Sequence, residues 1–453
     1  MNLNSLKKYA LWIGIFLGVL LLILNAINYD YRGGYDASGH IQYSKIISSK
    51  LRFPTKTESH ENYNPPLFYL FSGSIIRLTS IITGKDFDTS FNAFKPVGIL
   101  LAIGYLYAWY KIIQHLYSNK KIIQSAFLII LFSLPVFHKT IVMFNTEILL
   151  SFLVGLSFWY FITVFQHKPN IKTTFVLASL CSLALLTRFP ALSLFITLVF
   201  GIIGLGFIKK ISPKTTLKLL SIFLIFIIAT TSWFYYGRRN FGIYQGGRSS
   251  EPIETPFFKR QPLAFYFDIP FTLMMNYPIR FSLHTPLNRL IPIYYSDFWG
   301  DWWNYFSQRR FNISVKARRQ DHYLTSPDRV ANLALQNKVN LPATLLMIAG
   351  FLHLIIKIIK GVFNKPDKKW LIEGMFISLS LFTWAGLLIF LTKYPYYKAN
   401  GVKASYMLSA IPVYVYSAII FLFNILKKNK LIFTPLVIWL VLSTAVNLWF
   451  DYY

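Results

Sequence analysis

Charged residues are scarce in this sequence, and acidic residues are the scarcest of them. Only 14% of the 453 residues are charged, whereas 55% are hydrophobic and 18% are aromatic. So few polar groups cannot cover the surface of a soluble domain, because such a surface must meet water. The composition therefore excludes a soluble globular protein and indicates that lipid surrounds most of the chain.

The chain also has a single cysteine, Cys181, which lies within an apolar run. One cysteine excludes a disulfide within the chain, and it leaves the redox compartment open.

Basic residues far outnumber acidic ones, 46 Lys and Arg against 17 Asp and Glu, and the formal net charge is +29. In a soluble protein this excess would suggest a nucleic-acid partner. Here most lysine pairs fall in short loops between apolar runs, where they act as topology signals and meet anionic lipid headgroups. We therefore expect the lipid bilayer as a partner and no nucleic acid.

Apolar runs of about 20 residues recur along the chain, and each can cross a hydrocarbon core of roughly 30 Å as a helix. They predict an all-α polytopic membrane protein with about 11 transmembrane helices. The expected spans are 9–29, 96–116, 122–137, 147–165, 172–187, 189–208, 217–236, 341–361, 371–391, 405–425 and 431–449.

The short loops between these runs are basic, so the positive-inside rule places them and the N-terminus in the cytoplasm. The apolar stretch 66–83 would reverse this parity if it crossed the bilayer. Because it carries Arg77 in its middle, we expect it to lie on the outer membrane surface as an interfacial helix. The extracytoplasmic segments are then 30–95, 138–146, 237–340, 392–404 and the C-terminus.

Three parts of the chain follow from this topology. Residues 1–236 form an N-terminal transmembrane module that contains the first outer loop, 30–95. Residues 237–340 form a large extracytoplasmic loop, and residues 341–453 form a C-terminal transmembrane module. Any chemistry is expected in the outer loops.

The first outer loop contains the segment YRGGYDASGH, with Asp36 a few residues beyond the first span. A carboxylate at this depth is partly removed from water, which makes it a better proton acceptor. An aspartate near a helix end is also commonly a cap, so position alone leaves both interpretations open.

The order of features around Asp36 resembles that of the GT-C glycosyltransferases. An apolar first span precedes YDASGH, the amphipathic segment IQYSKIISSKL follows, and RFP and NPPLFYL come next. The segment FNTEILLSFL resembles the second outer loop of that class, and KANGVKASYMLSAIPVY resembles the outer end of a late helix. The closest likeness is to the protein O-mannosyltransferase and aminoarabinose transferase branch, glycosyltransferase family 39.

This resemblance implies an enzyme of hexosyl- or pentosyltransferase type. It would move a sugar from a polyprenyl-phosphate donor to a hydroxyl or other nucleophile of a protein, lipid or glycan acceptor at the extracytoplasmic face. A carboxylate that takes the acceptor proton on the face opposite the leaving group gives inversion. Cations must stabilise the departing phosphate. The resemblance places the catalytic role on Asp36, and Glu147 takes the position of the second-loop acid.

Other residues of the outer segments are candidates for binding the two substrates. Those expected near the donor phosphate are Glu147, Arg188, Lys398, Lys403, His138 and Lys139. Those expected near the acceptor or sugar are His40, Asn64, Asp297, Asp301 and Trp302. Arg188 has the alternative interpretation of a snorkelling arginine at a helix end, and the aromatic tract 294–306 has that of interfacial anchoring by tryptophans.

The histidines show no spacing typical of a metal centre. His40, His60, His138, His284 and His322 are scattered over the outer segments, so no histidine metal site is expected. The resemblance still allows a divalent cation, Mg²⁺ or Mn²⁺, held by Asp36, Glu147 and the donor phosphate.

Two other function classes stay open. A transporter or lipid flippase should carry charged residues near the middle of its spans. The interiors of the spans 96–116, 147–165, 217–236 and 431–449 carry neither an acidic residue nor a strong break, although Glu373 and Pro412 lie near span ends. A polyprenyl-linked glycan ligase or polymerase would share the large outer loop without depending on Asp36.

Overall fold

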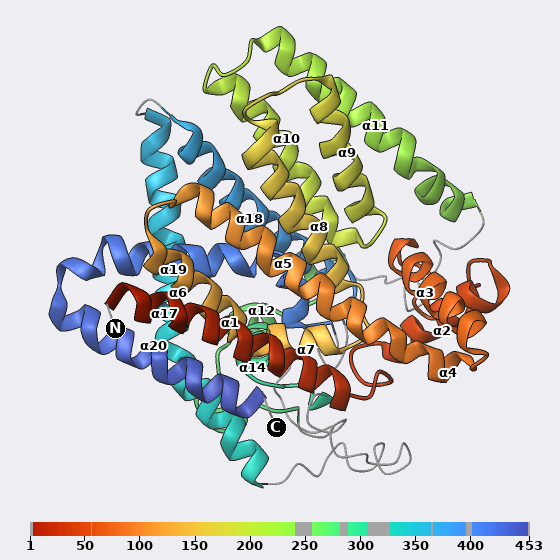
Figure 1. Ribbon diagram of the computed structural model, residues 1–453, viewed down its shortest axis with the longest axis horizontal. Helices are drawn as coiled ribbons and strands as arrows, with labels where there is room; N and C mark the ends of the chain where they lie inside the picture. Colours follow the sequence, from red (N-terminus) through yellow and green to blue (C-terminus); the bar gives the residue numbers. More distant parts are fainter. Residues whose placement is uncertain are drawn as a thin grey trace.

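The chain is an all-helical, multi-pass integral membrane protein. The computed structural model describes residues 3–55, 57–240, 256–280, 289–305, 327–363, 366–395 and 401–451. These residues form helices joined by turns and loops, and no strand occurs among them. Figure 1 shows the helices α8 to α11 gathered toward one end of the molecule and the helices α2 to α4 grouped at its side.

The first half of the chain supplies eleven α-helices. They are α1 (Leu3–Asn28), α2 (Ala37–Lys50), α3 (Leu67–Thr83), α4 (Phe87–Ser90), α5 (Phe94–Leu116), α6 (Lys121–Phe132), α7 (Pro135–Val142), α8 (Glu147–Tyr160), α9 (Ile171–Leu185), α10 (Leu192–Phe207) and α11 (Pro213–Asn240). Short 3₁₀ turns, η1 (Phe91–Ala93) and η3 (Phe189–Ala191), precede α5 and α10, and a π-helical turn, η2 (Phe161–Phe165), continues α8.

The second half begins with short helices and ends with long ones. They are η5 (Phe257–Lys259), α12 (Leu263–Phe267), α13 (Phe271–Asn276), α14 (Leu290–Trp299), α17 (Pro327–Phe363), α18 (Lys368–Lys393), η6 (Ala404–Met407), α19 (Ile411–Asn424), η7 (Leu426–Lys428) and α20 (Lys430–Asp451).

A helix forms at each of the eleven predicted spans, but fewer of them meet the length and hydropathy expected of a span. Eight described helices do so, and nine if the bent pair α6 and α7 forms one span. This pair bends by 57° at its break, where Pro135 begins α7. Helix α9 has only 15 residues. The count of eleven is therefore approximate.

Two helix boundaries differ from the prediction for local reasons. Helix α17 begins at Pro327 rather than near 341, because buried polar side chains in its first turns have partners that a hydropathy pattern does not reveal. Asn340, for example, donates to the Asn447 side chain of α20 at 2.7 Å. Helix α19 begins at Ile411 rather than near 405, with Pro412 in its first turn, where proline is well tolerated.

The stretch 66–83 is the 17-residue helix α3, and α2 packs along it. Arg77 lies in the middle of α3 and donates from Nη1 to the backbone oxygen of Ser48 at 2.8 Å. The positive charge therefore meets the C-terminal end of α2, where the helix dipole favours cations. The interfacial placement of α3 stays a prediction.

The long helices pack in pairs, and α17 with α19 is among the closest of these. Gly350 of α17 allows this approach. A Cβ atom at Gly350 would lie 2.4 Å from the backbone oxygen of Ser417 in α19, so any side chain there would push the two helices apart.

We expect Gly350→Ala to lower the free energy of unfolding by about 1–3 kcal/mol, since overpacking a tight contact is destabilising. Gly374 in α18 is the matched control, because a Cβ atom there would have no neighbour within 4 Å. Gly374→Ala should leave stability unchanged or slightly higher. Thermal denaturation in detergent compares the two variants, and equal midpoints would contradict the close packing of α17 on α19.

Candidate active site

Asp36 sits at the turn between the first span and α2. Its backbone is left-handed, with φ 54° and ψ 20°, a conformation that costs a non-glycine residue about 1–2 kcal/mol. Gly34 precedes it with φ 106°, and a Cβ atom there would lie 2.9 Å from the Met143 side chain. A glycine is thus required to bring the first outer loop against the segment before α8. Strain of this kind is commonly stored at functional sites.

Lys403 forms an ion pair with Asp36 across 367 positions of sequence. The lysine side chain is 6% exposed and the aspartate side chain is 24% exposed, so the Asp36 side chain is partly accessible to solvent. Burial lowers the pKa of Lys403, but Asp36, Tyr406 and Glu61 together outweigh this effect and hold the pKa above its usual value. Lys403 is therefore a cation in the folded protein.

A second buried ion pair joins Glu147, the first residue of α8, to Arg188 in the turn after α9. Arg188 also donates from Nη1 to the Thr146 hydroxyl at 2.9 Å. Asn145 fixes the start of the helix, because its side-chain oxygen accepts from the backbone nitrogen of Glu147 at 3.1 Å. The segment between α7 and α8 is thus held by charge as well as by packing.

Tyr406 in η6 links the two ion pairs. The Arg188 guanidinium carbon lies 4.7 Å from the centroid of its ring, and Lys403 Nζ lies 5.4 Å from the same centroid. Both cations gain from the electron-rich ring. Glu147, Arg188 and Tyr406 line one small pocket. The surrounding side chains leave no room in this pocket for a water molecule.

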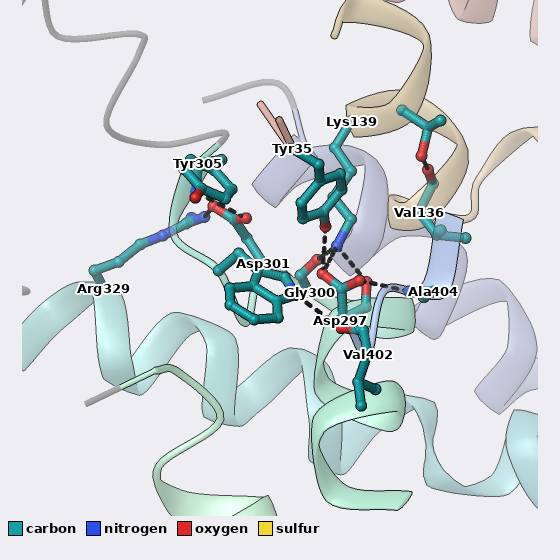
Figure 2. Close-up of polar contacts among 12 residues, drawn as sticks. Tyr35, Val136, Lys139, Asp297, Gly300, Asp301, Tyr305, Arg329, Val402 and Ala404 are labelled. Carbon is teal, nitrogen blue, oxygen red and sulfur yellow. Dashed lines mark hydrogen bonds and ion pairs between the residues drawn. The ribbon is translucent and has the colours of Figure 1, made fainter. Parts of the chain in front are cut away.

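Asp297 of α14 is fully buried beside these pairs and connects four segments of the chain (Figure 2). Its Oδ1 atom accepts from Tyr35 Oη at 2.7 Å and from Lys139 Nζ at 2.5 Å. Its Oδ2 atom accepts from the backbone nitrogen of Ala404 at 2.7 Å. Lys139 further donates to the backbone oxygen of Gly300 at 2.9 Å. Burial, with the Asp297 charge, raises the pKa of Tyr35 well above its usual value.

The other predicted residues of the large loop are buried too. Asp301 accepts from the backbone nitrogen of Tyr305 at 3.2 Å and lies 3.6 Å from Arg329, and Figure 2 shows its side chain directed toward both. Trp302 is buried next to it. These side chains stabilise the loop through contacts within the protein.

His40 and Asn64 meet at the Tyr69 hydroxyl in the first outer loop. The hydroxyl lies 2.7 Å from His40 Nδ1 and accepts from Asn64 Nδ2 at 3.2 Å. Asn64 also donates to Glu61. Burial lowers the pKa of His40 to about 3, so its ring is neutral at physiological pH. The charges of Asp36, Lys403, Glu147 and Arg188 all act on this ring, which places it among the two ion pairs.

One histidine joins a group that could hold a metal ion. One ligand atom each from Asp36, His60 and Glu61 lies within 4.8 Å of the others. The sequence-based expectation that no histidine groups in this way was wrong for His60. The segment 59–64 folds back on the start of α2, where the Ser59 hydroxyl donates to the backbone oxygen of Gly39 at 2.9 Å. Spacing along the chain cannot show such a fold-back.

One predicted phosphate ligand, His138, makes no described contact with the two ion pairs. His138 is buried against the ring of Phe132, with centroids 4.9 Å apart. Lys398 lies outside the described residues, as do His284 and His322. The structure therefore brings together Asp36, Lys403, Glu147, Arg188, His40 and Asn64 around one place, with Lys139 and Asp297 beside it.

Sequence reasoning missed four residues of this region: Tyr35, His60, Glu61 and Tyr406. Tyr35 is adjacent to Asp36, and Tyr406 lies in the segment near Lys403 that resembles the family. Their closeness in sequence to these candidates is the only feature that could have indicated them. The buried position of Glu61 depends on a loop conformation that the sequence pattern does not specify.

No protein-family model and no curated protein matches this chain. Among solved structures, it is similar to the archaeal oligosaccharyltransferase AglB from Archaeoglobus fulgidus in complex with an inhibitory peptide and a dolichol-phosphate. The TM-score is 0.50 and the identity 12%, and the match covers 99% of this chain and 56% of that one. A structure of the Archaeoglobus fulgidus oligosaccharyltransferase with Zn and sulfate gives a TM-score of 0.48 and 13% identity, with coverage of 96% and 53%.

This chain spans about half the length of those proteins. At such low identity the likeness establishes the fold alone, which is the GT-C fold that the sequence predicted. The likeness to the O-mannosyltransferase and aminoarabinose transferase branch stays a prediction.

We expect Lys139→Met to destabilise the protein by about 3–5 kcal/mol, because it leaves the buried Asp297 carboxylate without its cation. Adding Asp297→Asn should recover part of the loss, since the unpaired charge is then removed. Lys50→Met is the control, because Lys50 is exposed and pairs with Glu58 at 3.7 Å; a change of at most about 1 kcal/mol is expected. Thermal denaturation in detergent measures all three. A small effect of Lys139→Met alone would contradict a buried ion pair.

Proposed function

We propose that this protein is an inverting glycosyltransferase that moves a sugar from a polyprenyl-phosphate donor to a nucleophile of an acceptor at the extracytoplasmic membrane face. One observation carries the proposal. A partly exposed carboxylate, Asp36, lies beside the buried cation Lys403, and a second buried cation, Arg188, lies near the same Tyr406 ring. A proton acceptor and a phosphate-binding charge thus occur at one place.

Asp36 has the position and the exposure that a catalytic base requires. The positive charge of Lys403 stabilises a carboxylate, and the solvent-accessible part of the Asp36 side chain is where we propose that an acceptor hydroxyl is received. As the acceptor oxygen bonds to the sugar carbon, its proton passes to Asp36 and the bond from that carbon to the donor phosphate breaks. Attack opposite the leaving group inverts the configuration of the sugar carbon.

Arg188 and Lys403 are the groups that would stabilise the leaving phosphate. Both are nearly buried, so their charges act in a region of low dielectric, where they are worth more than in water. The guanidinium can bind two phosphate oxygens at once. The pocket beside them is closed in this structure, so we propose that the donor phosphate displaces Glu147 from Arg188 as it enters.

The first-loop residues His40 and Asn64 are the better candidates for contacts with the sugar or acceptor, because they lie on the side of Asp36 that α2 and the segment 59–64 form. Asp297 already accepts three hydrogen bonds from the chain. We therefore propose that it positions Tyr35 and the segment beside Lys403 instead of binding sugar.

The membrane supplies the remaining part of the proposal. Eight described helices are long and apolar enough to cross a membrane, and we propose that the polyprenyl tail of a donor lies among them. The neighbouring AglB structure contains a dolichol-phosphate and a peptide, which is compatible with a lipid-linked donor and a peptide acceptor here. We place the site outside the cytoplasm because the basic loops lie at the other ends of the helices.

We expect Asp36→Asn to lower sugar transfer by about 10²–10⁴-fold, the usual contribution of a general base. Membranes that contain the protein would be incubated with polyprenyl-phosphate sugars, and the products identified by mass spectrometry. Asp30→Asn is the matched control, because Asp30 lies in the same loop but pairs with the exposed Arg32. It should keep nearly full activity.

The two alternative functions give different outcomes in the same assay. A flippase would move the lipid-linked sugar across the bilayer without forming a new glycosidic bond. A ligase or polymerase would form product with Asp36→Asn at nearly the original rate. Either result would refute the proposed role of Asp36.

A further inference from the structure

The Asp36 carboxylate has two competing sets of neighbours. On one side it is a possible metal ligand, because ligand atoms of Asp36, His60 and Glu61 lie within 4.8 Å of one another. On the other side it already holds the ammonium group of Lys403. The charge of Glu61 also acts on Lys403, so the lysine is within electrostatic reach of a second member of the same group.

The convergence of these three side chains depends on Gly39 in the first turn of α2. A Cβ atom at Gly39 would lie 2.5 Å from the Cε1 atom of His60 and 2.7 Å from the Cγ atom of Glu61. No other residue would leave room for both side chains. Glu61 is further held by Asn64, so its carboxylate is fixed next to the start of the helix.

We propose that the Lys403 ammonium is the resident cation of this site and takes the place of a divalent metal ion. Sugar transfer then needs no divalent metal, and removal of the Lys403 charge uncovers a metal site made by Asp36, His60 and Glu61. The first part of this proposal rests on the proposed function, whereas the second part concerns metal binding alone.

Charge explains why the two cations exclude each other. The ammonium is nearly buried, so its repulsion of a divalent ion on the same carboxylate is weakly screened by salt. The other acid that the sequence offered as a metal ligand, Glu147, is likewise held by a basic side chain, Arg188. Both carboxylates therefore have a counter-charge that belongs to the chain itself.

The ligand types indicate which metal the uncovered site would take. One imidazole nitrogen and two carboxylates suit Mn²⁺ or Zn²⁺ better than Mg²⁺, which prefers oxygen ligands and keeps its water. His60 is 45% exposed, so an ion can reach the group from solvent.

Titration of the purified full-length protein in detergent with Mn²⁺, followed by electron paramagnetic resonance, tests the binding part. We expect weak binding by the wild-type protein and at least about tenfold tighter binding by Lys403→Met, because a unit positive charge next to the ion is removed. Adding His60→Gln to Lys403→Met should return binding to the wild-type level. Lys45→Met removes the same charge from an exposed position of α2 and should leave binding unchanged.

The activity part uses the same proteins in the transfer assay. EDTA should leave the wild-type rate within about twofold, whereas Lys403→Met should be impaired and recover partly when Mn²⁺ is added. Thermal denaturation and gel filtration would confirm that each variant is folded.

Several results would overturn the inference. They are equal Mn²⁺ affinity in the wild-type and Lys403→Met proteins, tighter binding that persists with His60→Gln, and loss of wild-type transfer in EDTA. If no variant transfers sugar at all, the proposed function fails, and the Mn²⁺ titration still decides the binding part.

Discussion

The rest of the site depends on the hydrogen bonds and the ion pair that the buried carboxylate of Asp297 forms. It lies in α14, yet its partners come from three other segments: Tyr35 from the first outer loop, Lys139 from α7 and Ala404 from the start of η6. A buried charge is strongly unfavourable without its partners, so these segments must assemble together. Their assembly places Asp36, which follows Tyr35, opposite Lys403, which precedes Ala404.

In this arrangement the carboxylate that holds the fold, Asp297, differs from the carboxylate that we propose for the reaction, Asp36. Asp297 is fully buried and already bonded, so it can fix geometry without taking part in a reaction. Asp36 is partly open and carries one cation, so it can meet a substrate. Arg188 and Lys403 both lie near the ring of Tyr406, and each is paired with a carboxylate of the chain. Both proposals, the glycosyl transfer and the use of a lysine in place of a metal, depend on the pairing of each acidic side chain with a basic one.

Much of the fold could be predicted from the sequence, because runs of apolar residues separated by basic loops are typical of helices that cross a bilayer. The resemblance around YDASGH pointed to Asp36, whose catalytic role stays a proposal. The role of Asp297 could not be predicted, since an acid within an aromatic tract is equally typical of a sugar-binding surface. His60 was dismissed because histidine spacing is a local signal, whereas its approach to Asp36 depends on how a loop folds back on α2. The early start of α17 depends on partners for Asn340 that lie about a hundred residues away.

Hydrogen–deuterium exchange of the Asp297→Asn variant, compared with the wild-type protein by mass spectrometry, tests the central claim most directly. If Asp297 holds the four segments together, exchange should rise in the first outer loop, in α7 and in η6 as well as in α14. The helices α9 to α11 should keep their protection. An increase confined to α14 would contradict the account, because the other segments would then hold their places without Asp297.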